Sequence, residues 1–264
     1  MPFIPLADFR MHYVERGTGK LTVVFVHGWL SSHRWWEPVL HRLPPGVRAF
    51  ALDWRGAGDS DPVEQGHTLL QYAADLQAFA DAIGLPPFWL VGHSMGGGVA
   101  LRYALDHPDH LRGLVLVNPL APFGTRTDPQ MDAWVRAQHG NPEGIRAMVQ
   151  LAFAILPSPE VLDSLVIDAM RWGPVAYFGT LDDMARFHVV EELPRLQIPT
   201  LVIWGDRDVV IPFDGIATVF TRIPNCGLEI WHGVGHSPAH EAPDRLVRVL
   251  MQFIDECQSI ERGA

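Results

Sequence analysis

The chain has 264 residues, 48% of them hydrophobic and 19% charged, a balance that suits one large globular domain and excludes wholesale disorder. Its 20 basic and 30 acidic residues give a formal net charge of −10, and no basic run occurs, so nucleic acids and acidic membrane surfaces are poor partners. Two cysteines cannot form a disulfide framework, and the sequence contains neither a signal-peptide pattern nor 18 consecutive apolar residues. We therefore expect a soluble, cytoplasmic protein that does not bind membranes.

Short apolar runs recur along the chain and predict strands that are buried on both faces of a sheet. In chain order the runs are Arg10–Glu15, which alternates and predicts a partly exposed strand, then Leu21–Val26, Val47–Leu52, Phe88–Val91, Leu114–Val117, Thr200–Trp204 and Leu228–Trp231. Helical spacing of apolar residues occurs over Thr68–Ile83, Met95–Leu105 and Pro243–Cys257. Alternation of buried strands with helices predicts an α/β domain around a mostly parallel sheet.

The stretch from 123 to 190 interrupts this alternation, because it has helical patterns and no strand pattern. Its predicted helices are Asp128–Gln138, Glu143–Leu156, Pro159–Trp172 and Val175–His188. We interpret 123–190 as a helical insertion between two strands, and 1–122 with 191–264 as the core domain. Long insertions at strand carboxyl ends usually shape ligand crevices, so a cap over a site is expected; a surface elaboration is the alternative.

The segment Gly92-His93-Ser94-Met95-Gly96 follows an apolar run and opens a helix. This strand–turn–helix context is typical of the G-x-S-x-G nucleophile elbow. The serine of an elbow lies on a strained turn, so the residues two positions before and after it must be small, as Gly92 and Gly96 are. We predict that Ser94 is a nucleophile; a glycine-rich turn with an idle serine is the alternative.

A serine hydroxyl needs a base to take its proton, and 13 histidines are candidates. His236 lies in a glycine-rich loop after the last apolar run, from which it can return to the nucleophile's end of the sheet. We interpret His27 as structural support of its turn and expect the His93 side chain to point away. His240 follows His236 by four residues, but the loop glycines argue against a helical metal-binding pair, and no metal site is predicted.

An acid is needed to orient the base and stabilise its charged form. Asp206 and Asp208 both follow the predicted strand 200–204. Asp208 lies deeper in the loop and is the predicted acid, whereas Asp206 is expected to cap the turn or pair with Arg207. Asn118, at the end of another strand, cannot supply a charge.

The oxyanion of the reaction intermediate needs two backbone N–H groups. The residue after the nucleophile, Met95, supplies one such group in elbows of this kind. The second is predicted to be the N–H of Trp29, because Gly28 permits the tight turn that directs this amide inward.

These residues together resemble the α/β-hydrolase superfamily over almost the whole chain. The matching segments are His27-Gly28-Trp29, Asp53-Trp54-Arg55-Gly56-Ala57-Gly58-Asp59-Ser60, the Ser94 elbow, and the loops of Asp208 and His236. The resemblance implies an α/β-hydrolase fold with a mostly parallel eight-stranded sheet, flanking helices and an inserted helical cap. The order serine, acid, histidine along the chain also fits this superfamily.

The resemblance also narrows the expected reaction. Dehalogenases and epoxide hydrolases use an aspartate nucleophile, which Ser94 excludes. Perhydrolase-type esterases usually have proline where Leu30 stands, and the glycine-rich oxyanion segment of the meta-cleavage C–C hydrolases is absent. A carboxylic ester hydrolase that uses water and no cofactor is therefore expected. C–C bond, lactone or thioester hydrolysis with the same triad stays open, and a ligand-binding receptor on this fold is the third hypothesis.

Apolar and aromatic residues near the predicted active end favour a small, fairly apolar ester as the substrate. The candidate pocket residues are Leu30, Trp35, Leu120, Trp134, Phe153 and Trp172. The alternative is that most of these aromatic side chains pack the cap. The superfamily often dimerises, but no apolar stripe decides the oligomeric state, and a homodimer stays open.

Overall fold

The computed structural model of the chain describes residues 2–126 and 128–263. The strands are β1 (Phe3–Pro5), β2 (Arg10–Arg16), β3 (Leu21–Val26), β4 (Val47–Leu52), β5 (Phe88–His93), β6 (Leu111–Val117), β7 (Thr200–Gly205) and β8 (Cys226–Trp231). The α-helices are α1 (Glu37–Leu40), α2 (Leu69–Ile83), α3 (Met95–Asp106), α4 (Pro129–Ala137), α5 (Pro142–Leu151), α6 (Pro159–Met170), α7 (Pro174–Arg186), α8 (Phe213–Arg222), α9 (Pro238–Glu241) and α10 (Pro243–Gly263).

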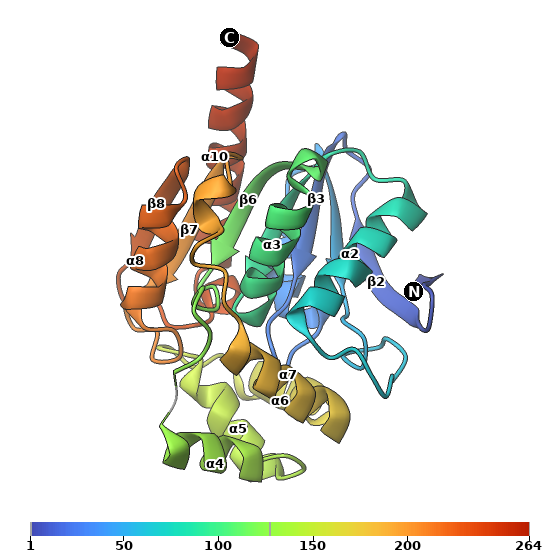
Figure 1. The fold of residues 1–264 in the computed structure, drawn as a ribbon, viewed down its shortest axis with the longest axis vertical. Helices are drawn as coiled ribbons and strands as arrows, with labels where there is room; N and C mark the ends of the chain where they lie inside the picture. The colour runs from blue at the N-terminus through green and yellow to red at the C-terminus, as the bar shows by residue number, and fades with distance from the viewer. Residues whose placement is uncertain (1, 127, 264) are drawn as a thin grey trace.

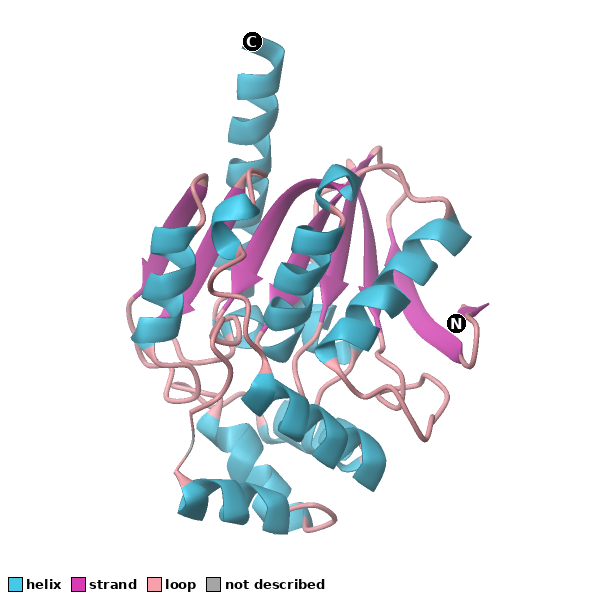
Figure 2. Ribbon diagram, in the orientation of Figure 1, coloured by secondary structure: helices cyan, strands magenta, loops and turns pink. Residues whose placement is uncertain are grey.

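The eight strands form one twisted sheet in the order β1-β2-β4-β3-β5-β6-β7-β8. β1 pairs with β2 and β2 with β4 in antiparallel fashion, and all other neighbours are parallel. The arrowheads of the parallel strands therefore point to the same edge of the sheet (Figure 2). The predicted α/β-hydrolase fold with a mostly parallel eight-stranded sheet is confirmed.

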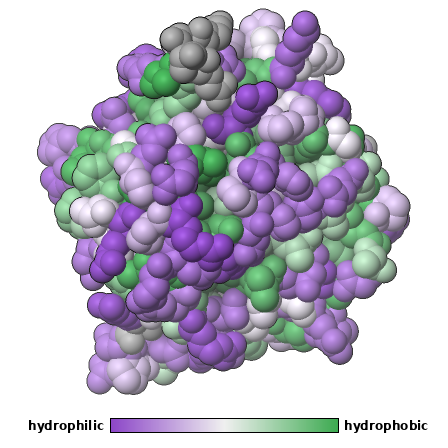
Figure 3. Space-filling model, turned by 45° about the horizontal axis from the view of Figure 1, so that its top comes forward, coloured by the Kyte–Doolittle hydropathy of each residue, from purple (hydrophilic) through white to green (hydrophobic). Residues whose placement is uncertain are grey.

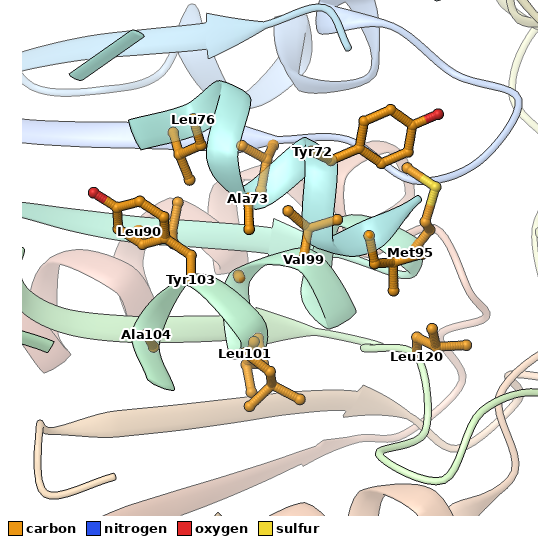
Figure 4. Packing of buried hydrophobic residues seen from close by; sticks show 14 of the residues in the cluster. Tyr72, Ala73, Leu76, Leu90, Met95, Val99, Leu101, Tyr103, Ala104 and Leu120 are labelled. Carbon is orange, nitrogen blue, oxygen red and sulfur yellow. The ribbon is translucent and has the colours of Figure 1, made fainter. Parts of the chain in front are cut away.

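Helices cover both faces of this sheet because its central strands are apolar on both sides. β5 shows the division: Leu90 packs into the cluster beneath α2 and α3, while Trp89 and Val91 pack into the cluster beneath α1 and α10. Figure 4 shows Leu90 of β5 among side chains of α2 and α3, Tyr103 included. The helices packed on the two faces support the sheet and determine where its loops emerge.

Helices α4 to α7 follow one another between β6 and β7. In Figure 1 they lie beyond the edge to which the parallel strands point, whereas the end of α10 projects from the opposite side. The helices begin as the sequence indicates: the side chain of Asp128 caps α4, accepting from the N–H groups of Gln130 and Met131.

Several elements differ from the sequence expectation. β1, α1, α8 and α9 were not predicted, and the predicted helix Glu143–Leu156 ends at Leu151. Apolar residues continue past that end, but the N–H groups of Ala154 and Ile155 turn to the carboxylate of Glu241 instead. Gly215 lowers the helix propensity of α8. A larger residue would not fit there, because its Cβ would lie 2.6 Å from the Cβ of Ala121. In both cases a tertiary contact overrides the local pattern.

On the face drawn in Figure 3, hydrophilic residues predominate and hydrophobic ones are interspersed among them. Across 2–126 and 128–263, no helix combines the length and apolar character needed to cross a membrane.

Candidate active site

Ser94 stands between β5 and α3 with a strained backbone, φ +53° and ψ −123°. The surrounding chain leaves room only for glycine: a Cβ at Gly92 would lie 2.5 Å from the carbonyl oxygen of Gly96, and one at Gly96 would lie 2.5 Å from that of His27. The N–H of Ser94 donates to the carbonyl of Val117 on β6. A non-glycine residue in this conformation costs energy, so the packing of the two strands and α3 must hold it.

Asp208 and His236 meet at the carboxyl ends of β7 and β8. His236 Nδ1 donates to Asp208 Oδ2 at 2.8 Å, and both residues are buried. The other carboxylate oxygen accepts the N–H groups of Val210 and Ile211. Burial alone would raise the pKa of Asp208, but the attraction and hydrogen bond of His236, helped by these donors, hold it below the ordinary value. Asp208 is therefore ionised at neutral pH.

Asn118, which follows β6, also binds Asp208. Its amide nitrogen donates to Asp208 Oδ2 and, at 3.2 Å, to the carbonyl of Gly235 next to His236. Its backbone has φ +45°, which asparagine tolerates better than most residues. From the sequence, Asn118 was expected only to lack a charge; a polar residue at a buried strand end is the signal that could have shown its role as a donor.

His93 was expected to point away, and the structure shows instead that it holds the His236 loop. Its Nε2 donates to the backbone carbonyl of His236 at 2.7 Å, and its ring lies 4.7 Å from the ring of His236. Burial lowers the pKa of His93 well below its ordinary value, so its imidazole is neutral. Trp35 stacks on it at 4.6 Å between ring centroids. Because His93 precedes Ser94, these contacts bring the His236 loop to the elbow.

The proposed oxyanion loop passes close to Ser94. A Cβ on Gly28 would lie 2.9 Å from the Cβ of Ser94, so only glycine fits there. Trp29 follows, and its ring packs on Tyr177 of α7 at 4.8 Å. Leu30 has φ +58°, a conformation closed to proline, whose φ is fixed near −65°. The N–H of Met95 lies at the start of α3, directly after Ser94.

Asp206 lies in the same loop as Asp208 and is used differently. It binds the exposed His232 at 2.6 Å and accepts the N–H of Gly233 at 2.7 Å, so it braces the turn before the His236 loop. Of the two roles expected for Asp206, the turn cap is the one that these bonds show. His27 supports its own turn as expected, since its Nδ1 bonds the carbonyl of Gly28.

The candidate pocket residues fall into three environments. Leu30 is partly buried, Trp134 is 38% exposed on α4, and Leu120 is buried beside the elbow, where its N–H donates to the carbonyl of Ser94. Trp35, Phe153 and Trp172 are buried. Trp172 Nε1 donates to the carbonyl of Ser31, and Trp35 packs between His93 and His240. The last three have the contacts of packing residues, and a pocket role for all six stays a prediction.

A second polar group surrounds Asp53, after β4. Ligand atoms of His12, His33, Asp53 and Asp59 all lie within 4.8 Å of one another, as in many metal sites. However, Asp53 Oδ2 accepts the Nδ1 atoms of both His12 and His33 at 2.8 Å, and Asp59 pairs with Arg34 at 2.7 Å. Burial opposes ionisation of Asp53, but the hydrogen bonds from the two histidines lower its pKa below the ordinary value. We interpret this group as a structural hydrogen-bond network.

The fold and the residues gathered at its strand ends define an α/β-hydrolase of the serine hydrolase class. The Hydrolase_4 family, described as serine aminopeptidase, S33, matches residues 17–243, and the chain belongs to this family. It is therefore a hydrolase, and its relatives in sequence include a haloperoxidase and a lipase.

Individual relatives are distant but match over nearly the whole chain. A non-heme haloperoxidase of Rhodococcus erythropolis is 28% identical over 97% of this chain and 100% of the relative. A monoacylglycerol lipase of Xenopus laevis is 25% identical over 96% of this chain and 82% of the relative. Among solved structures, an esterase from Exiguobacterium antarcticum superposes with a TM-score of 0.88 at 23% identity, covering 94% of this chain and 96% of that one.

Proposed function

We propose that this protein is a carboxylic ester hydrolase that cleaves small, fairly apolar esters through an acyl-enzyme on Ser94. The observation that carries the proposal is the strained Ser94 elbow beside the buried Asp208–His236 pair, all at one edge of the sheet. A lipase among the relatives also favours an ester as the substrate.

In this proposal His236 takes the proton of the Ser94 hydroxyl as the serine oxygen attacks the ester carbonyl carbon. Asp208 holds the imidazole through Nδ1, which leaves Nε2 as the base and stabilises the imidazolium that forms. The carbonyl oxygen gains negative charge and binds the N–H groups of Trp29 and Met95. His236 then protonates the departing alcohol, and water activated by the same imidazole releases the acid.

Helices α4–α7 are the proposed cap over this site. They lie at the edge of the sheet where Ser94 and His236 emerge, and Tyr177 of α7 contacts Trp29. Apolar side chains from α5, α6 and α7 meet Trp29 and Leu30 in one cluster, which favours an acyl or alkyl group over a charged one.

The test replaces the nucleophile. Ser94→Ala should reduce hydrolysis of p-nitrophenyl acetate and butyrate by at least about 10⁴-fold and abolish labelling by a fluorophosphonate probe. Circular dichroism should show an unchanged fold. Full activity of the folded variant would falsify the proposed nucleophile.

The substrate class needs a separate assay of the wild-type protein. Esters, lactones, thioesters and vinylogous diketones should be compared at equal concentration, with esters turned over fastest. Faster hydrolysis of a diketone, lactone or thioester would replace the esterase proposal and keep the nucleophile. A haloperoxidase among the relatives makes peroxide-dependent bromination a useful further arm. Leu30 stands where perhydrolase-type esterases usually have proline, and its φ of +58° differs from the φ near −65° that proline requires.

A further inference from the structure

A polar cluster joins helix α6 to the loop that follows Trp29. We call Ser32, Arg34, Asp59, Asp168 and Arg171 the Asp168 cluster. The hydroxyl of Ser32 donates to Asp168 Oδ2 at 2.5 Å, and Arg34 donates to Asp168 Oδ1 at 3.1 Å. Arg34 and Arg171 each bind Asp59 at 2.7 Å, so two parts of the core and the end of α6 share one network.

The centre of this cluster is buried. Ser32 is 0% and Asp168 3% exposed. Burial raises the pKa of Asp168, although Ser32 and Arg34 act against the rise. A buried carboxylate is tolerated only where partners satisfy it, so its two donors must be held in place. Asp168 in turn fixes the position of Ser32, whose oxygen also accepts the N–H of Arg34.

The residues between Gly28 and Arg34 are held from two sides. From the insertion, Trp172 Nε1 donates to the carbonyl of Ser31 at 3.0 Å, next to the Ser32–Asp168 bond. From the core, Asp53 accepts the backbone N–H of His33 at 2.6 Å. Trp29 therefore lies between Gly28, which follows β3 and packs against Ser94, and residues 31–33, which are clamped between α6 and the turn after β4.

We propose that Asp168 is a positioning residue that sets the Trp29 amide for oxyanion binding, by clamping this segment through Ser32 and Arg34. The inference rests on the proposed function, since it assigns a role to Trp29 in catalysis.

The geometry distinguishes this role from simple stabilisation. Exposed ion pairs contribute little to stability. Asp168 differs because it is buried and its two partners, Ser32 and Arg34, lie only three and five residues after Trp29 on the same short loop. Misplacing a catalytic group by about 1 Å can cost on the order of 10²-fold in rate.

The test compares two aspartates on the same helix. Asp168→Ala should lower kcat for p-nitrophenyl acetate by about 10- to 100-fold, with KM changed less than about threefold, because the lost interaction acts mainly in the transition state. Asp168→Asn keeps an acceptor for Ser32 and should lose less. Asp163→Ala, also on α6, removes the exposed pair with Arg146 of α5 and should leave kcat and KM unchanged.

The outcomes separate the two proposals. If wild-type protein hydrolyses esters and folded Asp168→Ala keeps its kcat while melting at a lower temperature, Asp168 is only structural and the inference is overturned. Should Asp168→Ala fail to fold, Ser32→Ala provides the same measurement, since it removes the buried bond and leaves the charge paired with Arg34. Absence of ester hydrolysis and of fluorophosphonate labelling in the wild type would overturn the proposed function, and the inference with it.

Discussion

Asp208 keeps its negative charge in a buried position because donors from three loops converge on it. Asn118 follows β6, Val210 and Ile211 belong to its own loop, and His236 follows β8. Such convergence makes the carboxylate a strong partner for a positively charged imidazole. The same bonds lower its pKa, so the stability that they contribute is present above pH 3.8 and is lost as the pH falls through the lower folded value.

This environment predicts the effect of removing the charge. Asp208→Asn should lower kcat on esters by about 10⁴-fold, because an amide neither stabilises the imidazolium nor holds the required tautomer. Asp206→Asn is the matched control: it alters a carboxylate of the same loop that binds the exposed His232, and kcat should stay within about twofold. Equal losses in the two variants would contradict the assignment of Asp208.

At the scale of elements, α3 packs on the sheet more closely than any side chain would allow. Helix α3 follows Ser94 directly, and Gly96 in its first turn faces the carbonyl oxygens of Val26 and His27 on and after β3. The close approach places the start of the helix, and with it the Met95 amide, beside the glycine-containing loop 27–29. Gly96 is therefore required for the packing of α3 on the sheet as well as for the turn at Ser94.

Two glycines of α3 provide a direct comparison. A Cβ at Gly96 would lie 2.5 Å from the His27 carbonyl oxygen, so Gly96→Ala should reduce the free energy of unfolding by about 1–3 kcal/mol in urea denaturation. At Gly98 a Cβ would meet the flexible ends of Leu69 and Leu120 at 3.0 Å. The gain of about 1 kcal/mol in helix propensity should offset this contact, leaving Gly98→Ala near wild-type stability. A loss for Gly96→Ala no larger than that for Gly98→Ala would contradict the close packing of α3 on β3.

At the scale of the whole molecule, we expect three histidines with lowered pKa values to dominate the response to acid. Burial lowers the pKa values of His27 and His240 from 6.5 to about 4, and that of His93 also falls. An unfolded chain would protonate these groups near pH 6.5, whereas the folded chain keeps them neutral. The unfolded state therefore binds more protons between pH 6.5 and 4, and stability falls as the pH is lowered through that range.

The expected loss is large enough to measure. Each shift from 6.5 to about 4 corresponds to about 3 kcal/mol, so the urea midpoint should decrease steeply from pH 7 to pH 4.5. His240→Gln should flatten this dependence, because one titrating group is removed from the core. A slope unaffected by His240→Gln would show that other groups control acid unfolding.

The sequence by itself determined the elements whose patterns are local. β3 and β4 have the predicted bounds, Thr68 and Asp128 cap their helices, and the serine elbow is recognisable from five consecutive residues. These features depend on periodicity, caps and small residues, which are properties of neighbouring positions. They were enough to establish the fold class and the candidate nucleophile, acid and base.

Only the tertiary structure decided which residues support the candidate site. Asn118 binds Asp208 across 90 positions, His93 holds the carbonyl of His236 across 143, and Ser32 reaches Asp168 across 136. No local pattern marks such partners, because a buried polar side chain is selected by the donors or acceptors that the folded chain brings to it. Burial and hydrogen bonding between distant strand ends, rather than the motifs themselves, therefore turn a recognisable elbow into an organised site.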